Sequence, residues 1–221
     1  MNKKLGLLVL CVLLTVAVAV AQDVHPALRP PKGASVAIVI FEDLECPDCA
    51  RAAPLVEEAA RTYKIPVVRH DFPLQMHPWA YDAAILARYF DTHSKAMGNE
   101  FRDTVFKHQL EITKETLRPF AEKFAAAHKI ELPFVVDPDG KFAKLIEADR
   151  AAGNQLNLQH TPTLYVVSKT YGHAFRGSCG PQPAVSAYRY DEERVARSVS
   201  GRFRAVLLAK LLGLSPWKHG S

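Results

Sequence analysis

Paired cysteines are scarce in this sequence of 221 residues, which contains four cysteines and a single run with the spacing C-x-x-C. That run, CPDC, occupies residues 46–49, whereas Cys11 and Cys179 are isolated. A structural zinc site needs four ligands and usually takes them from two such runs. The missing second run disfavours zinc, and a structural disulfide usually closes a longer loop. A reversible redox pair is therefore the interpretation that fits residues 46–49.

The sequence also lacks blocks of like charge, internal repeats and low-complexity tracts. Its formal net charge is +5, but the basic residues are interspersed with acidic ones. Proteins that bind nucleic acid usually gather their basic residues on one face or in one run. We therefore expect no nucleic-acid partner. The length and the 48% hydrophobic content are typical of one globular domain with an insertion.

The N-terminus has the pattern of a secretory signal peptide. Two lysines precede an apolar run at residues 5–20, and Ala19 and Ala21 are small residues at the positions that a signal peptidase reads. We expect cleavage after Ala21 and export to the periplasm or another extracytoplasmic space. An uncleaved anchor is the alternative, disfavoured because the apolar run is slightly shorter than a full membrane span.

The CPDC run lies where a predicted strand ends and a predicted helix begins. The apolar residues 36–41 predict a buried strand, and the pattern that follows predicts a helix to about Tyr63. A helix N-terminus offers unpaired N–H groups and a partial positive charge, which favour a thiolate. We therefore expect Cys46 to be the attacking thiol and Cys49 the buried resolving thiol. Pro47 suits the first helical position, where no N–H is needed.

The rest of the chain alternates between short strand patterns and longer helical ones. A second strand is predicted at 65–70, a third at 164–167 and a return strand around 174–176. Residues 22–34, rich in proline, predict a poorly ordered leader. A helix is expected to start at its N-cap Thr116, and residues 132–136 should form an edge strand or a loop. A further helix should begin at 137–139, with Phe142, Leu145 and Ile146 facing inward. An amphipathic helix is expected at 191–212.

Four features together resemble the exported disulfide oxidoreductases of the DsbA type. They are the apolar strand with FEDLE before CPDC, the run Phe72-Pro73-Leu74 followed by His77-Pro78, a helical insertion, and Thr161-Pro162-Thr163 opening a late strand. The resemblance covers most of the mature chain. It implies an α/β fold, with a thioredoxin-like mixed sheet of four or five strands flanked by helices. The expected divisions are a signal peptide at 1–21, a leader at 22–34, the domain at 35–214 with its insertion at about 75–130, and a tail at 215–221.

The resemblance also implies that Pro162 follows a cis peptide bond and packs beside the two cysteines. Such a loop leaves the main-chain N–H and C=O groups of Thr161 available to pair with an extended substrate segment. His160 precedes this loop. It is a candidate for substrate contact or for tuning the thiolate, and a solvated loop histidine is the alternative.

Two positions depart from the pattern of the family. Many relatives carry a buried glutamate six residues before the first cysteine, and here that residue is Ile40. Glu42, Asp43 or Glu45 could take over the relay of protons, although Glu42 and Glu45 could equally be solvated surface charges.

Asp48 is the other departure, since strong oxidases of the family have histidine between the proline and the second cysteine. A negative charge about 7 Å from a thiolate disfavours it by roughly 0.6–2.4 kcal/mol. Asp48 should therefore make the protein less oxidising than a relative with histidine at this position.

Cys179 follows the predicted return strand, which should run back towards the active-site end of the sheet. It is either a third redox thiol or an inert one, and we expect it not to pair with Cys46 or Cys49.

The leading hypothesis is a protein thiol–disulfide oxidoreductase that introduces disulfides into exported proteins and needs no cofactor. The resemblance implies reoxidation by a membrane partner of the DsbB or vitamin K epoxide reductase-like kind. A reductase or isomerase with the same residues is the close alternative, distinguished by its reduction potential. A metal carrier and a peptide-binding chaperone are alternatives from other classes. We expect a monomer.

Overall fold

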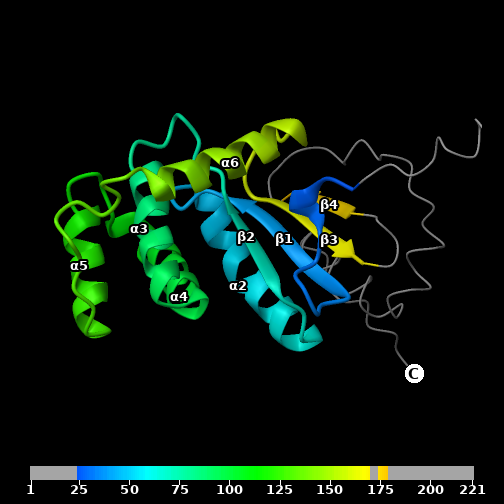
Figure 1. Ribbon diagram of the computed structural model, residues 1–221, viewed down its shortest axis with the longest axis horizontal. Helices are drawn as coiled ribbons and strands as arrows, with labels where there is room; N and C mark the ends of the chain where they lie inside the picture. The colour runs from blue at the N-terminus through cyan, green and yellow to red at the C-terminus, as the bar shows by residue number, and fades with distance from the viewer. Residues whose placement is uncertain (1–23, 170–173, 179–221) are drawn as a thin grey trace, which may run out of the picture.

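Four strands form one mixed sheet in the part of the chain that the structure describes. This computed structural model describes residues 24–169 and 174–178. The strand order is β2-β1-β3-β4, in which β1 pairs with β2 in parallel and the other two pairs are antiparallel (Figure 1). The predicted thioredoxin-like mixed sheet is confirmed. The strands are β1 (Val36–Glu42), β2 (Val67–Asp71), β3 (Thr163–Ser168) and β4 (Ala174–Ser178).

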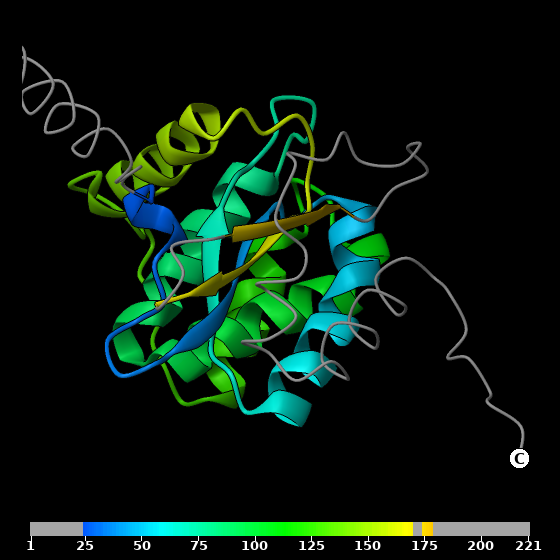
Figure 2. The same ribbon diagram turned by 90° about the vertical axis from the view of Figure 1, so that its right-hand side faces the viewer.

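Two helices cover opposite faces of this sheet, and three more build an insertion at one end. Figure 2 shows α2 and α6 on either side of the strands, and Figure 1 shows α3, α4 and α5 together beyond the edge strand β2. The helices and 3-10 turns are η1 (Pro26–Leu28), α2 (Pro47–Tyr63), α3 (Ala80–His93), α4 (Lys95–Lys107), η2 (Gln109–Glu111), α5 (Leu117–Ala127) and α6 (Lys141–Gln155).

Strand alternation explains how β1 serves both faces, because successive side chains point to opposite sides of a sheet. Ile40 packs with Val56 of α2 in one hydrophobic cluster. Its neighbour Phe41 belongs to the cluster on the other face, against which Ala152 of α6 packs. All the residues from Ala37 to Glu42 are buried, so β1 is the central strand of the core.

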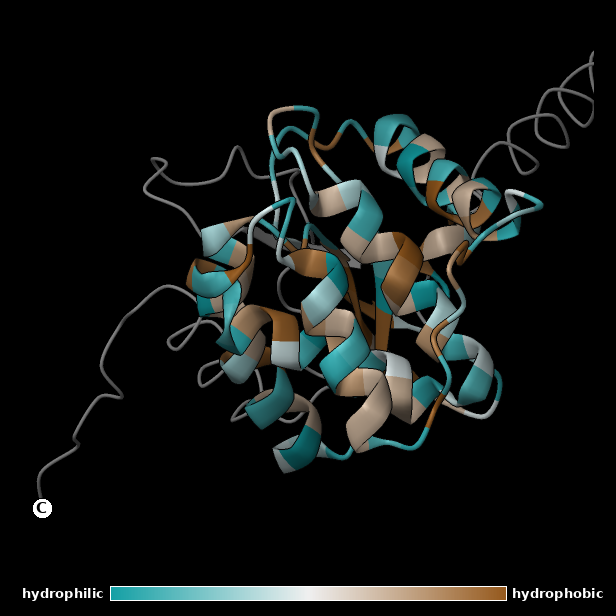
Figure 3. Cartoon of the chain, turned by 90° about the vertical axis from the view of Figure 1, so that its left-hand side faces the viewer, coloured by the Kyte–Doolittle hydropathy of each residue, from teal (hydrophilic) through white to brown (hydrophobic). Residues whose placement is uncertain are grey.

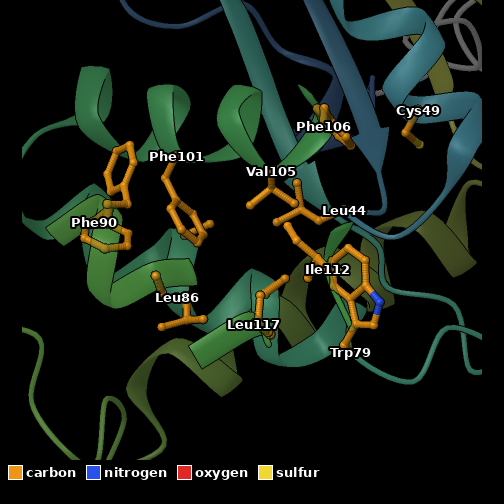
Figure 4. Packing of buried hydrophobic residues seen from close by; sticks show 14 of the residues in the cluster. Leu44, Cys49, Trp79, Leu86, Phe90, Phe101, Val105, Phe106, Ile112 and Leu117 are labelled. Carbon is orange, nitrogen blue, oxygen red and sulfur yellow. The ribbon is translucent and has the colours of Figure 1, made fainter. Parts of the chain in front are cut away.

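The insertion has a core of its own that continues into the site of the two cysteines. Aromatic rings of α3, α4 and α5 meet at Phe90, Phe101 and Phe124, with ring centroids 4.7–5.2 Å apart. Figure 4 shows this cluster running past Val105 to Cys49. Figure 3, viewed from the insertion, shows hydrophobic strands behind helices that carry both hydrophilic and hydrophobic segments.

Buried ion pairs join the sheet edge to the helices. Arg102 of α4 is 1% exposed and bonds Asp71 at the end of β2 and Asp91 of α3. Arg88 of α3 bonds the same Asp71 and Asp149 of α6. A buried charge is tolerated only when it is paired, so these contacts fix the insertion against the sheet.

Two local expectations from the sequence are wrong. Residues 24–34 are not a loose leader, because Leu28 is buried against the α6 face of the sheet. Leu145 does not face inward but is 46% exposed, unlike its neighbours Phe142 and Ile146. Thr116 is the N-cap residue of α5, as predicted, and its side chain makes no capping hydrogen bond. Residues 132–136, left open as strand or loop, are a loop.

Several expectations fall on parts of the chain outside the described residues. They concern the signal peptide, Cys179, the helix at 191–212 and the tail. Among the residues described, no helix is both long enough and apolar enough to span a membrane.

Candidate active site

Cys46 lies between the end of β1 and the start of α2, as the sequence predicts. It is the N-cap residue of α2, Pro47 follows at the first helical position, and the Cys46 carbonyl accepts the N–H of Ala50. Cys46 is 5% exposed and Cys49 is 1% exposed, and both are free thiols in this structure. The buried second thiol is also as predicted.

The two thiols have opposite proton affinities. A hydrogen bond from Cys49 is the largest influence on Cys46, and it lowers the Cys46 pKa from 9.0 to about 6 against the opposing effect of burial. Burial raises the pKa of Cys49 well above 9.0, and the adjacent Cys46 raises it further. At neutral pH Cys46 is therefore mainly thiolate, while Cys49 keeps its proton.

The proline loop lies directly beside this pair. The Thr161–Pro162 peptide bond is cis, and Cys46 Sγ is 3.5 Å from the Thr161 carbonyl oxygen. The antiparallel register of β1 and β3 explains the proximity, because Thr163 pairs with Phe41 close to the end of β1. The predicted cis bond and its position are thus confirmed. The hydroxyl of Thr161 is buried and makes no hydrogen bond within the described residues.

His160 is half-buried at the start of this loop. Its main-chain carbonyl accepts a hydrogen bond from the Thr163 hydroxyl at 2.8 Å, which helps to shape the turn. A role of His160 in tuning the thiolate stays a prediction.

Glu42 and Glu45, the candidate proton relays, are both engaged by other groups. Glu42 is 2% exposed and pairs with Arg69 of β2 at 3.1 Å, and Arg69 also bonds Asp103 at 2.7 Å. Burial raises the pKa of Glu42, and the charge of Arg69 opposes that effect. Glu45 accepts the main-chain N–H of Trp79 at 2.7 Å. The alternative of solvated surface charges is therefore wrong for Glu42.

Asp43, which the sequence suggested only as a possible proton relay, contacts the buried thiol of Cys49. Its main-chain N–H points to Cys49 Sγ at 3.4 Å. Its carboxylate accepts hydrogen bonds from the N–H of Glu45, the N–H of Leu74 and Nδ1 of His77, each at 2.7 Å. The hydrogen bond from the Glu45 N–H to the Asp43 side chain forms an Asx turn. An aspartate whose side chain accepts the main-chain N–H two residues later is typical of such a turn.

Gln109 of η2 also reaches the active-site loop, and nothing in the sequence marks it. Its side-chain amide donates to the carbonyl oxygens of Leu44 at 2.9 Å and Cys46 at 3.1 Å. The insertion therefore contacts the residues that lead into the CPDC run.

Asp48 forms an ion pair with Arg51 one turn further along α2. The sequence analysis considered the charge of Asp48 alone. Because Arg51 offsets part of that charge, the effect on the Cys46 thiolate should lie in the lower part of the expected range. Among the described residues, no group of three or more His, Cys, Asp or Glu side chains could hold a metal ion.

Comparison with known proteins adds three kinds of similarity. Residues 31–176 match a family model described as thioredoxin. A stretch of 141 residues, 63% of this chain, is 30% identical to the Na(+)/H(+) antiporter NhaA 3 of Salinispora tropica. That stretch covers 21% of the antiporter, so the chain spans about a fifth of this curated relative.

Solved structures share the fold at low sequence identity. Wolbachia pipientis alpha-DsbA1 is 16% identical with a TM-score of 0.59, and the match covers 86% of this chain and 99% of that one. Wolbachia pipientis alpha-DsbA2, described as a thiol-disulfide exchange protein, is 19% identical with a TM-score of 0.56, covering 69% and 81%. A periplasmic thioredoxin-like protein of Salmonella enterica serovar Typhimurium is 17% identical with a TM-score of 0.53, covering 65% and 83%.

Proposed function

The chain belongs to the thioredoxin family and has the DsbA-like form of its fold, and from this premise we propose that it oxidises the dithiols of exported proteins. The observation that carries the proposal is the pair of cysteines at the N-terminus of α2. Cys46 has a pKa of about 6, whereas the pKa of Cys49 is raised well above 9.0. Such an asymmetric pair suits thiol–disulfide exchange, in which one sulfur reacts with the partner and the other stays protected.

Oxidation of a substrate begins from the form with a Cys46–Cys49 disulfide. A substrate thiolate attacks Cys46 Sγ, the bond between the two cysteines breaks, and Cys49 leaves as a thiolate that takes up a proton. A second substrate thiolate then attacks the substrate sulfur of the mixed disulfide and releases the Cys46 thiolate. The substrate loses two electrons as its disulfide forms, and the protein gains them as a dithiol. The low pKa of Cys46 makes it a good leaving group in the second step.

Reoxidation runs through the same sulfurs. The Cys46 thiolate attacks a disulfide of the oxidising partner, and Cys49 then displaces that partner and restores the Cys46–Cys49 bond. We propose a membrane partner of the DsbB or vitamin K epoxide reductase-like kind. This proposal rests on the resemblance of the chain to exported oxidoreductases and on the signal-peptide pattern of residues 1–21.

The substrate segment should bind in extended form beside the proline loop. The Thr161 carbonyl lies 3.5 Å from Cys46 Sγ, so a strand paired with the main chain of Thr161 would hold its cysteine next to that sulfur. Pro162 shapes the loop, and Thr161 supplies the contacts.

Two cysteine variants test the proposal. Cys46→Ala should abolish oxidation of a reduced model protein. Cys49→Ala should instead accumulate mixed disulfides, because Cys46 still reacts and no second thiol displaces the substrate. Turnover by Cys49→Ala at the normal rate would contradict the assigned roles. Suppression of aggregation that survives loss of both cysteines would point to a chaperone.

The reduction potential, measured by equilibration with glutathione, separates an oxidase from a reductase or isomerase. A potential well above that of thioredoxin, about −270 mV, supports the proposal, and one close to that value favours the reductase alternative.

A further inference from the structure

Asp43 connects the buried thiol to the segment that leads into the insertion. Its main-chain N–H lies 3.4 Å from Cys49 Sγ, and both residues are 1% exposed. The segment from Leu74 to Trp79 follows β2 and precedes α3. Cys49 and Trp79 belong to the same hydrophobic cluster (Figure 4). The sulfur of Cys49 is therefore enclosed in an apolar region, where it forms a hydrogen bond with the Cys46 thiol and contacts the main-chain N–H of Asp43.

The carboxylate of Asp43 is held by hydrogen bonds on both of its oxygens. One oxygen accepts the N–H of Glu45, and the other accepts Nδ1 of His77 and the N–H of Leu74. The side chain of Asp43 is 0% exposed, and that of His77 is 17% exposed. Three hydrogen bonds from two different segments hold this one residue in place. His77 is the partner that ties Asp43 to the insertion through a side chain.

A thiolate at Cys49 has to form whenever the Cys46–Cys49 bond opens, and again just before it closes. Burial disfavours that charge, and so does Glu42 close by. A correctly oriented main-chain N–H is one of the few groups that can offset these effects, since hydrogen bonds to charged groups are about twice as strong as those between neutral groups. The bond from Asp43 favours the thiolate of Cys49.

We propose that His77 and the carboxylate of Asp43 are positioning residues for Cys49, because together they hold the Asp43 N–H on its sulfur. The inference rests on the proposed thiol–disulfide exchange and assigns the control of its second sulfur to a pair outside the CPDC run. In the sequence, His77 was noted only as part of the His77-Pro78 pair that contributes to the family resemblance. The structure places His77 in contact with the Asp43 side chain, and the main-chain N–H of Asp43 contacts the Cys49 thiol.

The test compares steps that use Cys49 with one that does not. In His77→Ala, reduced glutathione should open the Cys46–Cys49 disulfide about tenfold more slowly, and Cys49 should displace glutathione from Cys46 about tenfold more slowly, as expected for loss of one oriented bond to a charged atom. Alkylation of the Cys46 thiolate by iodoacetamide should change less than about twofold. The contact between Cys46 and Asp43 is a main-chain hydrogen bond, from the Cys46 N–H to the Asp43 carbonyl at 3.1 Å, and it does not involve the Asp43 carboxylate or His77.

His77→Asn provides the rescue, because its side-chain amide keeps an N–H near the position of Nδ1. It should recover most of the lost rate, which a general loosening of the fold would not allow. His108→Ala is the matched control, since His108 also pairs with an acidic neighbour, Glu111, but on the exposed surface of the insertion. If His77→Ala does not fold, the same comparison of His77→Asn with Asp43→Asn tests the pair.

Normal rates for both Cys49 steps in His77→Ala would overturn the inference. An equal loss in Cys46 alkylation, or no rescue by His77→Asn, would overturn it as well. Failure of the unaltered protein to exchange disulfides at all would instead overturn the proposed function.

Discussion

Replacing Cys49 with alanine should raise the pKa of Cys46, because the hydrogen bond from Cys49 is the largest influence that lowers it. With a pKa of about 6, about 90% of the Cys46 side chain is thiolate at pH 7. A hydrogen bond to a charged group contributes about 1.5–3 kcal/mol, equivalent to roughly one to two pH units in a pKa. The thiolate fraction of Cys49→Ala at pH 7 should therefore fall to roughly 10–50%.

The assay is a titration of the thiolate by its ultraviolet absorbance, with Cys46→Ala as the blank for tyrosines and other thiols. Cys49→Ser is the matched control, because its hydroxyl retains a donor at the same place. Its Cys46 pKa should stay closer to that of the unaltered protein than the pKa of Cys49→Ala does. An unchanged pKa in Cys49→Ala would show that the helix terminus and the main chain, rather than the second thiol, stabilise the charge.

Three further predictions follow from the same site. Because the pKa of Cys46 is depressed, its thiolate is lost as the pH falls through about 6, so its alkylation rate should climb with pH and level off above neutrality; a rate still rising steeply above pH 8 would contradict this. Asp48→His should lower the Cys46 pKa and raise the reduction potential by tens of millivolts, at about 30 mV for each 1.4 kcal/mol, in a glutathione equilibrium; an unchanged potential would mean that Arg51 already neutralises Asp48. A thiol count on the oxidised, mature protein should find one free thiol, that of Cys179, whereas none would indicate another pairing.

The sequence predicted the part of the site that depends on neighbours along the chain. A strand, a proline at the first helical position and an amphipathic pattern place Cys46 at a helix N-terminus without any long-range contact. Pro162 was placed beside Cys46 by resemblance, and the physical reason is the pairing of β3 with β1. That register is a long-range property, so local pattern alone does not reveal it.

The residues that the sequence missed act across the chain. Gln109 lies 63 positions from the Cys46 carbonyl that it contacts, and His77 lies 34 positions from Asp43. Nothing near Gln109 in the sequence indicates its contact, and His77 was noted as part of a family motif without its contact to Asp43. Asp43 had a local signal in its turn, but its contact with Cys49 depends on the turn geometry rather than on residue type. Leu145 failed for the opposite reason: its apolar side chain fits the helical stripe, yet it is 46% exposed.

The departure at Ile40, where many relatives carry a buried glutamate, illustrates how the fold constrains a substitution. Side chains two residues apart in a strand share a face, so Glu42 points to the same side of the sheet as Ile40 and lies about 7 Å further along β1 towards the cysteines. Ile40 fills the apolar contact with α2, while Glu42 lies close enough to Cys49 to raise its pKa. A role of Glu42 as a proton relay stays a prediction. Arg69 favours the ionised form of Glu42, and burial favours its protonated form.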